Sequence, residues 1–272
     1  MAETKMNVQL LAHSQLSEKF IHSLDYGEFA ENLLDDHDVT DGQAVALTAI
    51  RSCYSVNKPT EIVAKEGAKY FGSKASDGGE GTDADRLFRH IFASKHTSTL
   101  EHISFTFAIE GVSRALLAQL TRHRVGFSFS VQSQRYVRMG RNDKSGGFDY
   151  VVPEKVVNST YEDNNDYFDP ENGHTTETYY PQISFSNAMD YIQDIYDDLR
   201  EMGVPAEDAR AVLPQAAATN LVMTANLTAL LSFYSKRKKG RGAQAEITEL
   251  AEALRREVVD VEPWTAQFFE EV

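Results

Sequence analysis

Apolar and polar residues alternate along the chain with two different periods, which predicts a mixture of strands and helices. Met6 to Leu11 alternates weakly, and Ile103 to Ile109 has polar or small residues between its apolar positions. A period of two residues indicates strands, the second of them with one buried face. Residues 14–38 are polar and predict only helical or irregular structure.

Seven further segments carry apolar residues at helical spacing or are bounded by helix signals. They are residues 42–51, 87–93, 113–121, 188–202, 205–213, 226–236 and 243–259. Ser113 is available as an N-cap, and Pro205 followed by acidic residues is typical of a first helical turn. Because helices and strands do not alternate regularly, we expect an α+β fold rather than a doubly wound parallel sheet.

Two polar stretches interrupt this pattern and predict mobile loops. Residues 65–85 contain five glycines, and residues 142–178 place acidic side chains between tyrosines. Both are typical of solvated excursions at the edge of a domain. We expect residues 1–272 to form a single domain, with a central, mainly antiparallel twisted sheet flanked by helices.

The composition is consistent with one folded domain in a reducing compartment. A hydrophobic fraction of 42% with a mean hydropathy of -0.41 excludes global disorder. The first residues lack the apolar core of a signal peptide, and no run of about 18 apolar residues predicts a membrane span. The one cysteine, Cys53, excludes an internal disulfide and a multi-cysteine metal site. We therefore expect a cytoplasmic protein that binds no membrane.

The charge distribution singles out one segment as a candidate anion site. The chain has 27 Lys and Arg against 41 Asp and Glu, a net charge of -14, so the molecule as a whole repels phosphorylated ligands. Gly111 to Asn142 nevertheless contains no acidic residue, and its six arginines are Arg114, Arg122, Arg124, Arg135, Arg138 and Arg141. Planar guanidinium groups suit phosphate and pyrophosphate, so an anionic ligand is expected there.

The same segment has a second interpretation as an RNA-binding face. Phe127, Phe129 and Tyr136 would then stack with bases. The acidic net charge and the absence of lysine from residues 111–142 argue against nucleic acid as a partner. A second basic cluster, residues 236–241, follows a predicted helix and is typical of a solvated helix C-terminus.

Three other patterns carry little weight as functional signals. Gly79 to Ala84 matches the loose G-x-G-x-x-A pattern of dinucleotide-binding turns, but the preceding residues do not read as a buried strand. His90, His96 and His102 recur every six residues, a step that separates side chains on a helix, so separate roles or packing are favoured over a metal site. Cys53 suits nucleophilic attack, although a lone cysteine after an apolar helix is more typical of packing.

The order of the arginines resembles a known signature. Arg122-His123-Arg124, followed after eight residues by Ser133-Gln134-Arg135-Tyr136, resembles the motif of the flavin-dependent thymidylate synthases. Three more stretches are similar in order and spacing: His96 to His102 with the strand beyond it, Ala209 to Pro214, and Thr224 to Ile247. Together the similar segments cover about residues 45–259.

The resemblance implies a homotetramer whose active sites form between subunits, each with FAD. The implied reaction is the reductive methylation of dUMP to dTMP, with 5,10-methylenetetrahydrofolate as the one-carbon donor and NADPH as the reductant. FAD would carry the redox chemistry and the methylene, while the protein holds it against the uracil ring. The alternatives are a nucleic-acid-binding module and a family member that binds flavin and dUMP without turnover.

Carried over position by position, the resemblance implies two sets of ligands. The FAD set is His96, Ser98, Arg122, His123, Arg124, Asn226 and Ser232, the last standing where Asn or His is frequent. The dUMP set is Gln119, Arg122, Ser133, Gln134, Arg135, Arg210 and Arg237. It also includes the nucleotide-contacting position that precedes Ser133 in the motif, which either Val131 or Gln132 fills.

Arg237 is implied as the catalytic residue. Its guanidinium would stabilise negative charge as uracil N3 ionises, which makes C5 nucleophilic. No histidine and acid are close to Ser133 in the sequence, so we expect this serine to bind phosphate rather than act as a nucleophile. A catalytic thiol is then not needed, and Cys53 is expected in the wall of the flavin pocket or in packing. No metal is expected.

Overall fold

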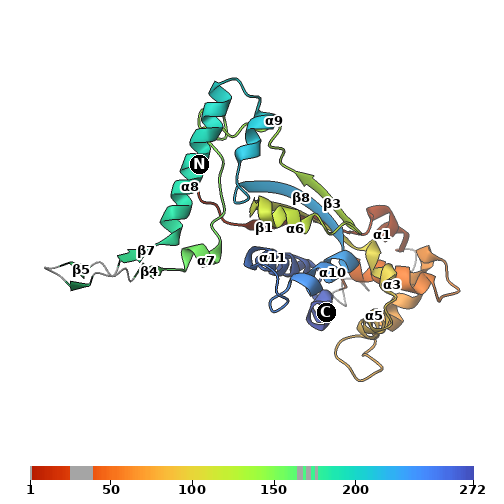
Figure 1. Ribbon diagram of the computed structural model, residues 1–272. Helices are drawn as coiled ribbons and strands as arrows, with labels where there is room; N and C mark the ends of the chain where they lie inside the picture. Colours follow the sequence, from red (N-terminus) through yellow and green to blue (C-terminus); the bar gives the residue numbers. More distant parts are fainter. Residues whose placement is uncertain (1, 25–38, 164–167, 170–172, 175–176) are drawn as a thin grey trace.

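A four-stranded antiparallel sheet lies at the centre of the molecule (Figure 1). The computed structural model of the chain describes residues 2–24, 39–163, 168–169, 173–174 and 177–272. The strand order is β1-β2-β8-β3, and the strands are β1 (Asn7–His13), β2 (Ser104–Ser113), β3 (Phe127–Val131) and β8 (Ala218–Asn226). The expected α+β fold with a central antiparallel sheet is confirmed.

Helices account for most of the remaining chain. The α-helices are α1 (Glu18–Leu24), α3 (Asp41–Ser52), α4 (Ile62–Phe71), α5 (Asp83–Ala93), α6 (Arg114–Leu120), α7 (Glu154–Val157), α8 (Pro181–Glu201), α9 (Ala206–Ala209), α10 (Leu227–Arg237), α11 (Ala245–Val261) and α12 (Ala266–Glu271). Short 3-10 helices are η1 (Pro59–Glu61), η2 (Thr97–His102), η3 (Arg210–Val212) and η4 (Pro263–Thr265). Among the described residues, no helix combines the length and the apolar character that crossing a membrane requires.

The main core lies between the sheet and the helices drawn below it in Figure 1. Phe105 and Phe107 of β2 are fully buried, and Phe107 is in register with Met223 of β8. Phe233 of α10 and Leu250 of α11 belong to the same buried cluster. This packing places the end of α10 and the start of α11 close to the segments that carry the arginines.

A bulge at the end of β2 turns the chain into α6. The pairing of β2 with β8 shifts between Ile109 and Val112, and Gly111 in this shift has a φ of 65°. A Cβ at Gly111 would lie 2.4 Å from the carbonyl oxygen of Lys5, so both the backbone conformation and the space require glycine. Beyond the bulge, Ser113 caps α6, and its hydroxyl accepts a hydrogen bond from the Leu116 N–H.

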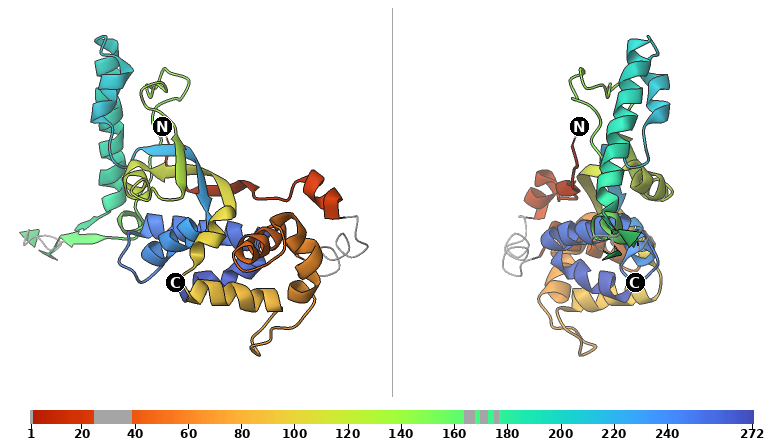
Figure 2. Two further views of the ribbon diagram at one scale, coloured as in Figure 1. Left: turned by 90° about the vertical axis from the view of Figure 1, so that its right-hand side faces the viewer. Right: turned by 60° about the vertical axis from the view of Figure 1, so that its left-hand side comes forward.

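A second, smaller buried cluster lies under α8, the long helix that packs beside α7 and α9 (Figure 1, Figure 2). Phe148 is 1% exposed and Tyr150 is 8% exposed. The buried amide of Gln193 accepts from the Phe148 N–H and donates to the Met139 carbonyl. The prediction that residues 142–178 form a solvated excursion is therefore wrong for the first part of this range, which packs against α8.

The projecting part of that excursion consists of two short antiparallel strand pairs. Strand β4 (Tyr161–Asp163) pairs with β7 (Glu177–Tyr179), and β5 (Phe168–Asp169) pairs with β6 (Gly173–His174). Figures 1 and 2 show this extension pointing away from the central sheet.

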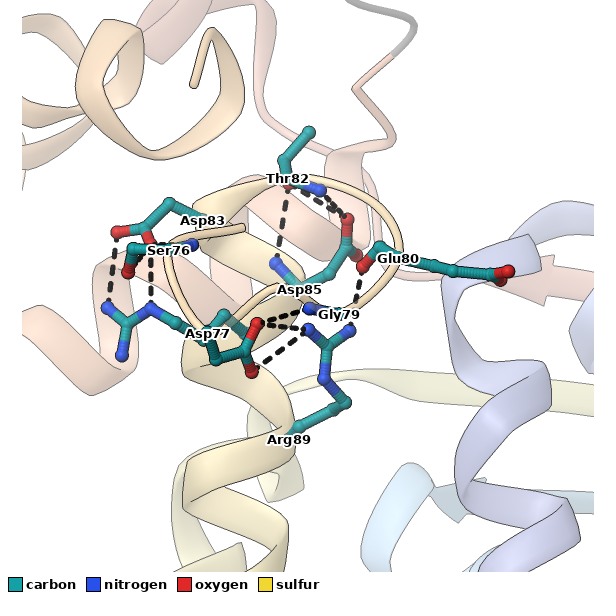
Figure 3. Close-up of polar contacts among 9 residues, drawn as sticks. Ser76, Asp77, Gly79, Glu80, Thr82, Asp83, Asp85 and Arg89 are labelled. Atoms are coloured by element: carbon teal, nitrogen blue, oxygen red, sulfur yellow. Dashed lines mark hydrogen bonds and ion pairs between the residues drawn. The ribbon is translucent and has the colours of Figure 1, made fainter. Parts of the chain in front are cut away.

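The glycine-rich loop is shorter than predicted, because α4 continues to Phe71 and α5 begins at Asp83. Polar contacts restrain what remains of it (Figure 3). Arg89 of α5 lies 3.3 Å from a carboxylate oxygen of Asp77 and donates to the carbonyl of Glu80. Thr82 and Asp85 form a capping box at the start of α5. The G-x-G-x-x-A pattern lies in this loop, after a helix rather than a strand.

Candidate nucleotide and flavin site

The arginine signature begins in the turn that connects α6 to β3. Arg122 and Arg124 are exposed, whereas His123 between them is half-buried. The His123 ring packs edge-on against Phe233 of α10, with ring centroids 5.0 Å apart, and lies 6.1 Å from the Phe127 ring. Two aromatic rings thus fix the imidazole while its neighbours extend into solvent.

His123 is in direct contact with Arg237, the last residue of α10. Nε and Nη2 of Arg237 each lie 3.4 Å from Nε2 of His123. A guanidinium only donates hydrogen bonds, so Nε2 must accept, and the imidazole is neutral. Burial, followed by the positive charges of Arg237, Lys236 and Arg122, lowers the pKa of His123. The fold therefore brings the predicted catalytic arginine to the centre of the signature, which is 114 positions away in the chain.

The other predicted flavin ligands lie near the start of α10. Asn226 caps this helix, and its side-chain oxygen accepts from the Ala229 N–H at 2.8 Å. The hydroxyl of Thr228 donates to the Thr97 carbonyl at 2.8 Å, which joins α10 to the segment of His96. We call His96, the Arg122–Arg124 turn, Asn226 and Arg237 the flavin cluster.

Two predicted flavin ligands and one unexpected residue complete this region. Ser98 of η2 and Ser232 of α10 are both exposed. Tyr54, which the sequence reasoning did not single out, lies with its hydroxyl 3.0 Å from Nδ1 of His96. The Tyr54 contact orients the imidazole of His96, which starts η2.

The predicted phosphate ligands gather in the turn after β3. The hydroxyl of Ser133 accepts from the Arg135 N–H at 3.2 Å, so the serine and the arginine share one tight turn. Nε of Arg135 lies 2.7 Å from a carboxylate oxygen of Glu207, and Nε of Arg210 donates to the Glu207 carbonyl. The segment of Arg210 and the Ser133 turn, far apart in sequence, are therefore neighbours in space.

Arg114 belongs to the same region, although the resemblance assigned it no role. Its Nη2 donates to the carbonyl of Gln132 at 3.2 Å, while its Nε is buried without a hydrogen-bond partner. Burial and the nearby positive charge of Arg210 lower its pKa, although the guanidinium stays charged. Nε2 of Gln134 is a second buried donor without a partner. We call Arg114, the Gln132–Arg135 turn and Arg210 the phosphate cluster.

Val131 and Gln132, the two candidates for the position before the serine, differ in their surroundings. Val131 ends β3 and packs against the main core. Gln132 directly precedes Ser133 and lines a small polar cavity of about 210 Å³. The other residues that line this cavity include none of the other predicted ligands, so the choice between Val131 and Gln132 stays a prediction.

Most arginines of the two clusters have no ion-pair partner. In the part of the chain that the structure describes, ion pairs engage Arg51, Arg86, Arg89, Arg135, Arg141 and Arg255. Arg114, Arg122, Arg124, Arg210 and Arg237 have no carboxylate partner there, in a protein of net charge -14. Unpaired guanidinium groups and two buried orphan donors match the acceptor-rich phosphates of a nucleotide or a dinucleotide cofactor.

The structure also places the residues of three weaker sequence signals: Cys53, the candidate RNA-stacking rings and the three histidines. Cys53 is exposed, so its interpretation as a packing residue is wrong; it lines an apolar cavity of about 590 Å³ beside α3. Of the three rings in the RNA-binding interpretation, Phe127 and Phe129 are half-buried and stack with centroids 5.8 Å apart, whereas Tyr136 is 79% exposed. His90 lies on α5, whereas His96 and His102 bound η2. Within the described ranges, no group of three potential metal ligands is present.

Comparisons with known proteins agree on one family. Residues 33–264 match the Thy1 family, described as thymidylate synthase complementing protein. The flavin-dependent thymidylate synthase of Geobacter sulfurreducens is 37% identical over 82% of this chain and 80% of its own length. The enzyme of the same name from Nitratidesulfovibrio vulgaris is 40% identical over 60% of this chain and 59% of its own length.

A solved structure shares the fold. The UMP/dUMP methylase PolB from Streptomyces cacaoi, bound with 5-Br dUMP, superposes with a TM-score of 0.65 at 22% identity. The match covers 99% of this chain and 97% of the PolB chain.

Proposed function

The chain belongs to the family of flavin-dependent thymidylate synthases, and from this premise we propose that it methylates dUMP to dTMP with FAD, 5,10-methylenetetrahydrofolate and NADPH. The observation that carries the proposal is the contact of Arg237 with His123 inside a group of arginines that have no carboxylate partners. Such an arrangement is suited to binding anions and to stabilising charge that develops on a bound ring.

The flavin cluster would hold FAD. Arg122 and Arg124 would bind its pyrophosphate, and His96, Ser98 and Asn226 would contact the remainder of the cofactor, with Ser232 at its edge. When bound, FAD supplies the redox chemistry and carries the one-carbon unit to the nucleotide. The chain contributes the orientation of the cofactor and the electrostatics around it.

The phosphate cluster would hold dUMP. Ser133 and Arg135 present a hydroxyl and a guanidinium from one turn, and Arg210 adds a second guanidinium beside them. Arg114 supplies a buried donor to the same anion. Gln119, Gln132 and Gln134 provide neutral groups that recognise the rest of the nucleotide.

Arg237 would activate the uracil ring. A guanidinium that cannot lose its proton stabilises the negative charge that forms when N3 of uracil ionises, and this charge makes C5 nucleophilic. His123 holds Arg237 in place by accepting from two of its nitrogens, and only a neutral imidazole can do so. The chain thus activates the substrate without a nucleophilic side chain, and Cys53 has no role in the reaction.

We further propose a homotetramer in which each active site uses more than one chain. The candidate ligands Ser98, Arg122, Arg124, Arg135, Arg210 and Ser232 are all exposed on the single chain. A site that excludes water needs further walls, and neighbouring subunits would supply them. The two clusters lie at opposite ends of α6, so one chain would give each cluster to a different site.

The visible spectrum of the purified protein tests this function. We expect flavin absorption bands that persist through gel filtration after the protein is mixed with FAD, and a change in these bands when dUMP is added. A protein that takes up no FAD would contradict the proposal. Glu249→Ala, an exposed change on α11 outside both clusters, serves as the matched control.

A further inference from the structure

Gln119, in the last turn of α6, is held by a residue from another helix. Its Nε2 donates to the carbonyl of Ala115 at 3.3 Å and to Oε1 of Gln244 at 2.6 Å. A backbone carbonyl can only accept, so the nitrogen of the Gln119 amide must face it. Both N–H bonds of this amide are thereby used, and Oε1 has no partner within the described part of the chain.

Gln244 is itself held in place by the start of α11. It occupies the N-cap position, and its carbonyl accepts the first helical hydrogen bond from the Thr248 N–H at 3.1 Å. Two residues further on, Glu246 accepts from both the N–H of Ser113 at 2.7 Å and its hydroxyl at 2.5 Å. Ser113 caps the start of α6, and Gln119 lies in its last turn. The N-terminus of α11 therefore contacts both ends of α6.

These contacts determine what the Gln119 side chain can offer to a ligand. An amide that rotates freely presents either an acceptor or a donor, whereas this one presents only its oxygen. The bond to Ala115 lies within α6 and is the longer of the two, so the contact with Gln244 restrains the amide most strongly.

We propose that Gln244 is a positioning residue that fixes the Gln119 amide as a hydrogen-bond acceptor for a donor group of the bound nucleotide. The inference rests on the proposed function, in which Gln119 binds dUMP. Loss of Gln244 frees the amide to turn its N–H groups towards that donor, which weakens nucleotide binding without any change in the flavin cluster.

A double-mutant cycle on the FAD-loaded enzyme tests the inference, with the Kd for dUMP measured by calorimetry. Because one neutral hydrogen bond is at stake, Gln244→Ala is expected to raise the Kd by roughly 3- to 10-fold. Gln244→Glu keeps an acceptor oxygen and is expected to retain most of the affinity. Combining Gln244→Ala with Gln119→Ala is expected to weaken binding no more than Gln119→Ala alone.

Three results would overturn the inference: an unchanged Kd in Gln244→Ala, an equal loss in Gln244→Glu, or additive losses in the double variant. The flavin spectrum and the melting temperature of each variant are recorded in parallel, with Glu249→Ala as the control. Gln244 is exposed, so its replacement leaves the core intact. Failure of the wild-type enzyme to bind dUMP would instead contradict the proposed function, and the inference with it.

Discussion

At the scale of single residues, the contact between His123 and Arg237 determines what the site can do. A guanidinium fixed by two nitrogen contacts is oriented before the substrate arrives, which lowers the cost of ordering it during the reaction. Burial and the positive charges of Arg237, Lys236 and Arg122 lower the pKa of His123 and so favour its neutral form.

Arg237→Ala is expected to abolish dTMP formation while FAD stays bound. Removing the guanidinium leaves no group to stabilise the ionised uracil, and the loss in kcat should reach roughly 100-fold or more, as for other oxyanion-stabilising donors. Turnover is measured by separating dTMP from dUMP, and flavin content is measured by absorbance. Arg256→Ala on α11, an exposed arginine without an ion pair, is the matched control. If Arg237→Ala turns over as fast as the wild type, Arg237 does not activate the uracil ring.

The protonation state of His123 predicts a loss of activity at acid pH. Burial and three nearby positive charges lower the pKa of His123 below its usual value near 6.5, so the neutral form dominates at neutral pH. As the pH falls through this lowered pKa, the imidazolium can no longer accept from Arg237 and repels it. We expect kcat/KM for dUMP to fall on the acid side of the profile.

The matched comparison for this pH dependence is His123→Gln. Its side-chain oxygen accepts a hydrogen bond at every pH, so the acid limb assigned to His123 should disappear from the profile. An acid limb of the same position and steepness in His123→Gln would show that another group titrates there.

The sequence supplied most of the candidate site residues but not their contacts. The signature from Arg122 to Arg135 was readable because its order is specific. Arg114 lay in the same acid-free segment, yet its burial and its closeness to the positive charge of Arg210 arise only from tertiary packing. Tyr54 was invisible to sequence reasoning because its contact with His96 joins positions 42 apart through tertiary packing.

At the scale of elements, α6 links the two clusters and receives support from α11. Strand β2 leads into α6 through the bulge at Gly111, and the helix delivers the chain to the arginine signature. The carboxylate of Glu246 fixes the start of α6 at the buried Ser113. The spacing of the two clusters is therefore set by a helix whose ends are both anchored.

Arg89 provides two of the several contacts that restrain the loop between α4 and α5. Arg89→Ala removes the ion pair with Asp77 and the hydrogen bond to the Glu80 carbonyl, while the capping box of α5 remains (Figure 3). We expect limited proteolysis to cut faster between residues 72 and 82, with little change in melting temperature, because the ion pair is largely exposed. Equal cleavage rates in Arg89→Ala, Arg256→Ala and wild type would show that other contacts hold the loop.

Periodicity predicted most elements, and the misses have physical reasons. Strand β3 alternates Phe127, Phe129 and Val131 with serines. This alternation was not used to predict a strand, because the residues were considered only as possible ligand contacts. Strand β8 buries every second residue from Thr219 to Ala225, a pattern diluted by the exposed Val222. Helix α12 was missed because six residues give too few turns for a periodic signal.

At the scale of the whole molecule, an acidic chain holds five arginines without ion-pair partners in its two clusters. The chain has 41 acidic residues, yet Arg114, Arg122, Arg124, Arg210 and Arg237 have no carboxylate partner within the described ranges. Such an arrangement concentrates positive potential where phosphates bind and leaves the rest of the surface acidic.

The proposed assembly predicts that two inactive variants restore activity when their subunits mix. Arg237→Ala removes the catalytic guanidinium and Arg210→Ala removes a guanidinium of the phosphate cluster. A shared site can combine the intact residue of each kind from different chains. Light scattering is expected to give four times the 30.5 kDa chain mass. A monomer with full activity, or a mixture no more active than its components, would contradict shared sites.

The central claim is that this chain makes dTMP with flavin and arginine rather than with an enzyme nucleophile. The most direct measurement is dTMP formation by purified Cys53→Ala and wild-type protein, with and without FAD, from dUMP, 5,10-methylenetetrahydrofolate and NADPH. We predict equal, FAD-dependent turnover in both proteins. No dTMP from the FAD-loaded wild type, or activity that is independent of FAD or lost in Cys53→Ala, would contradict the account.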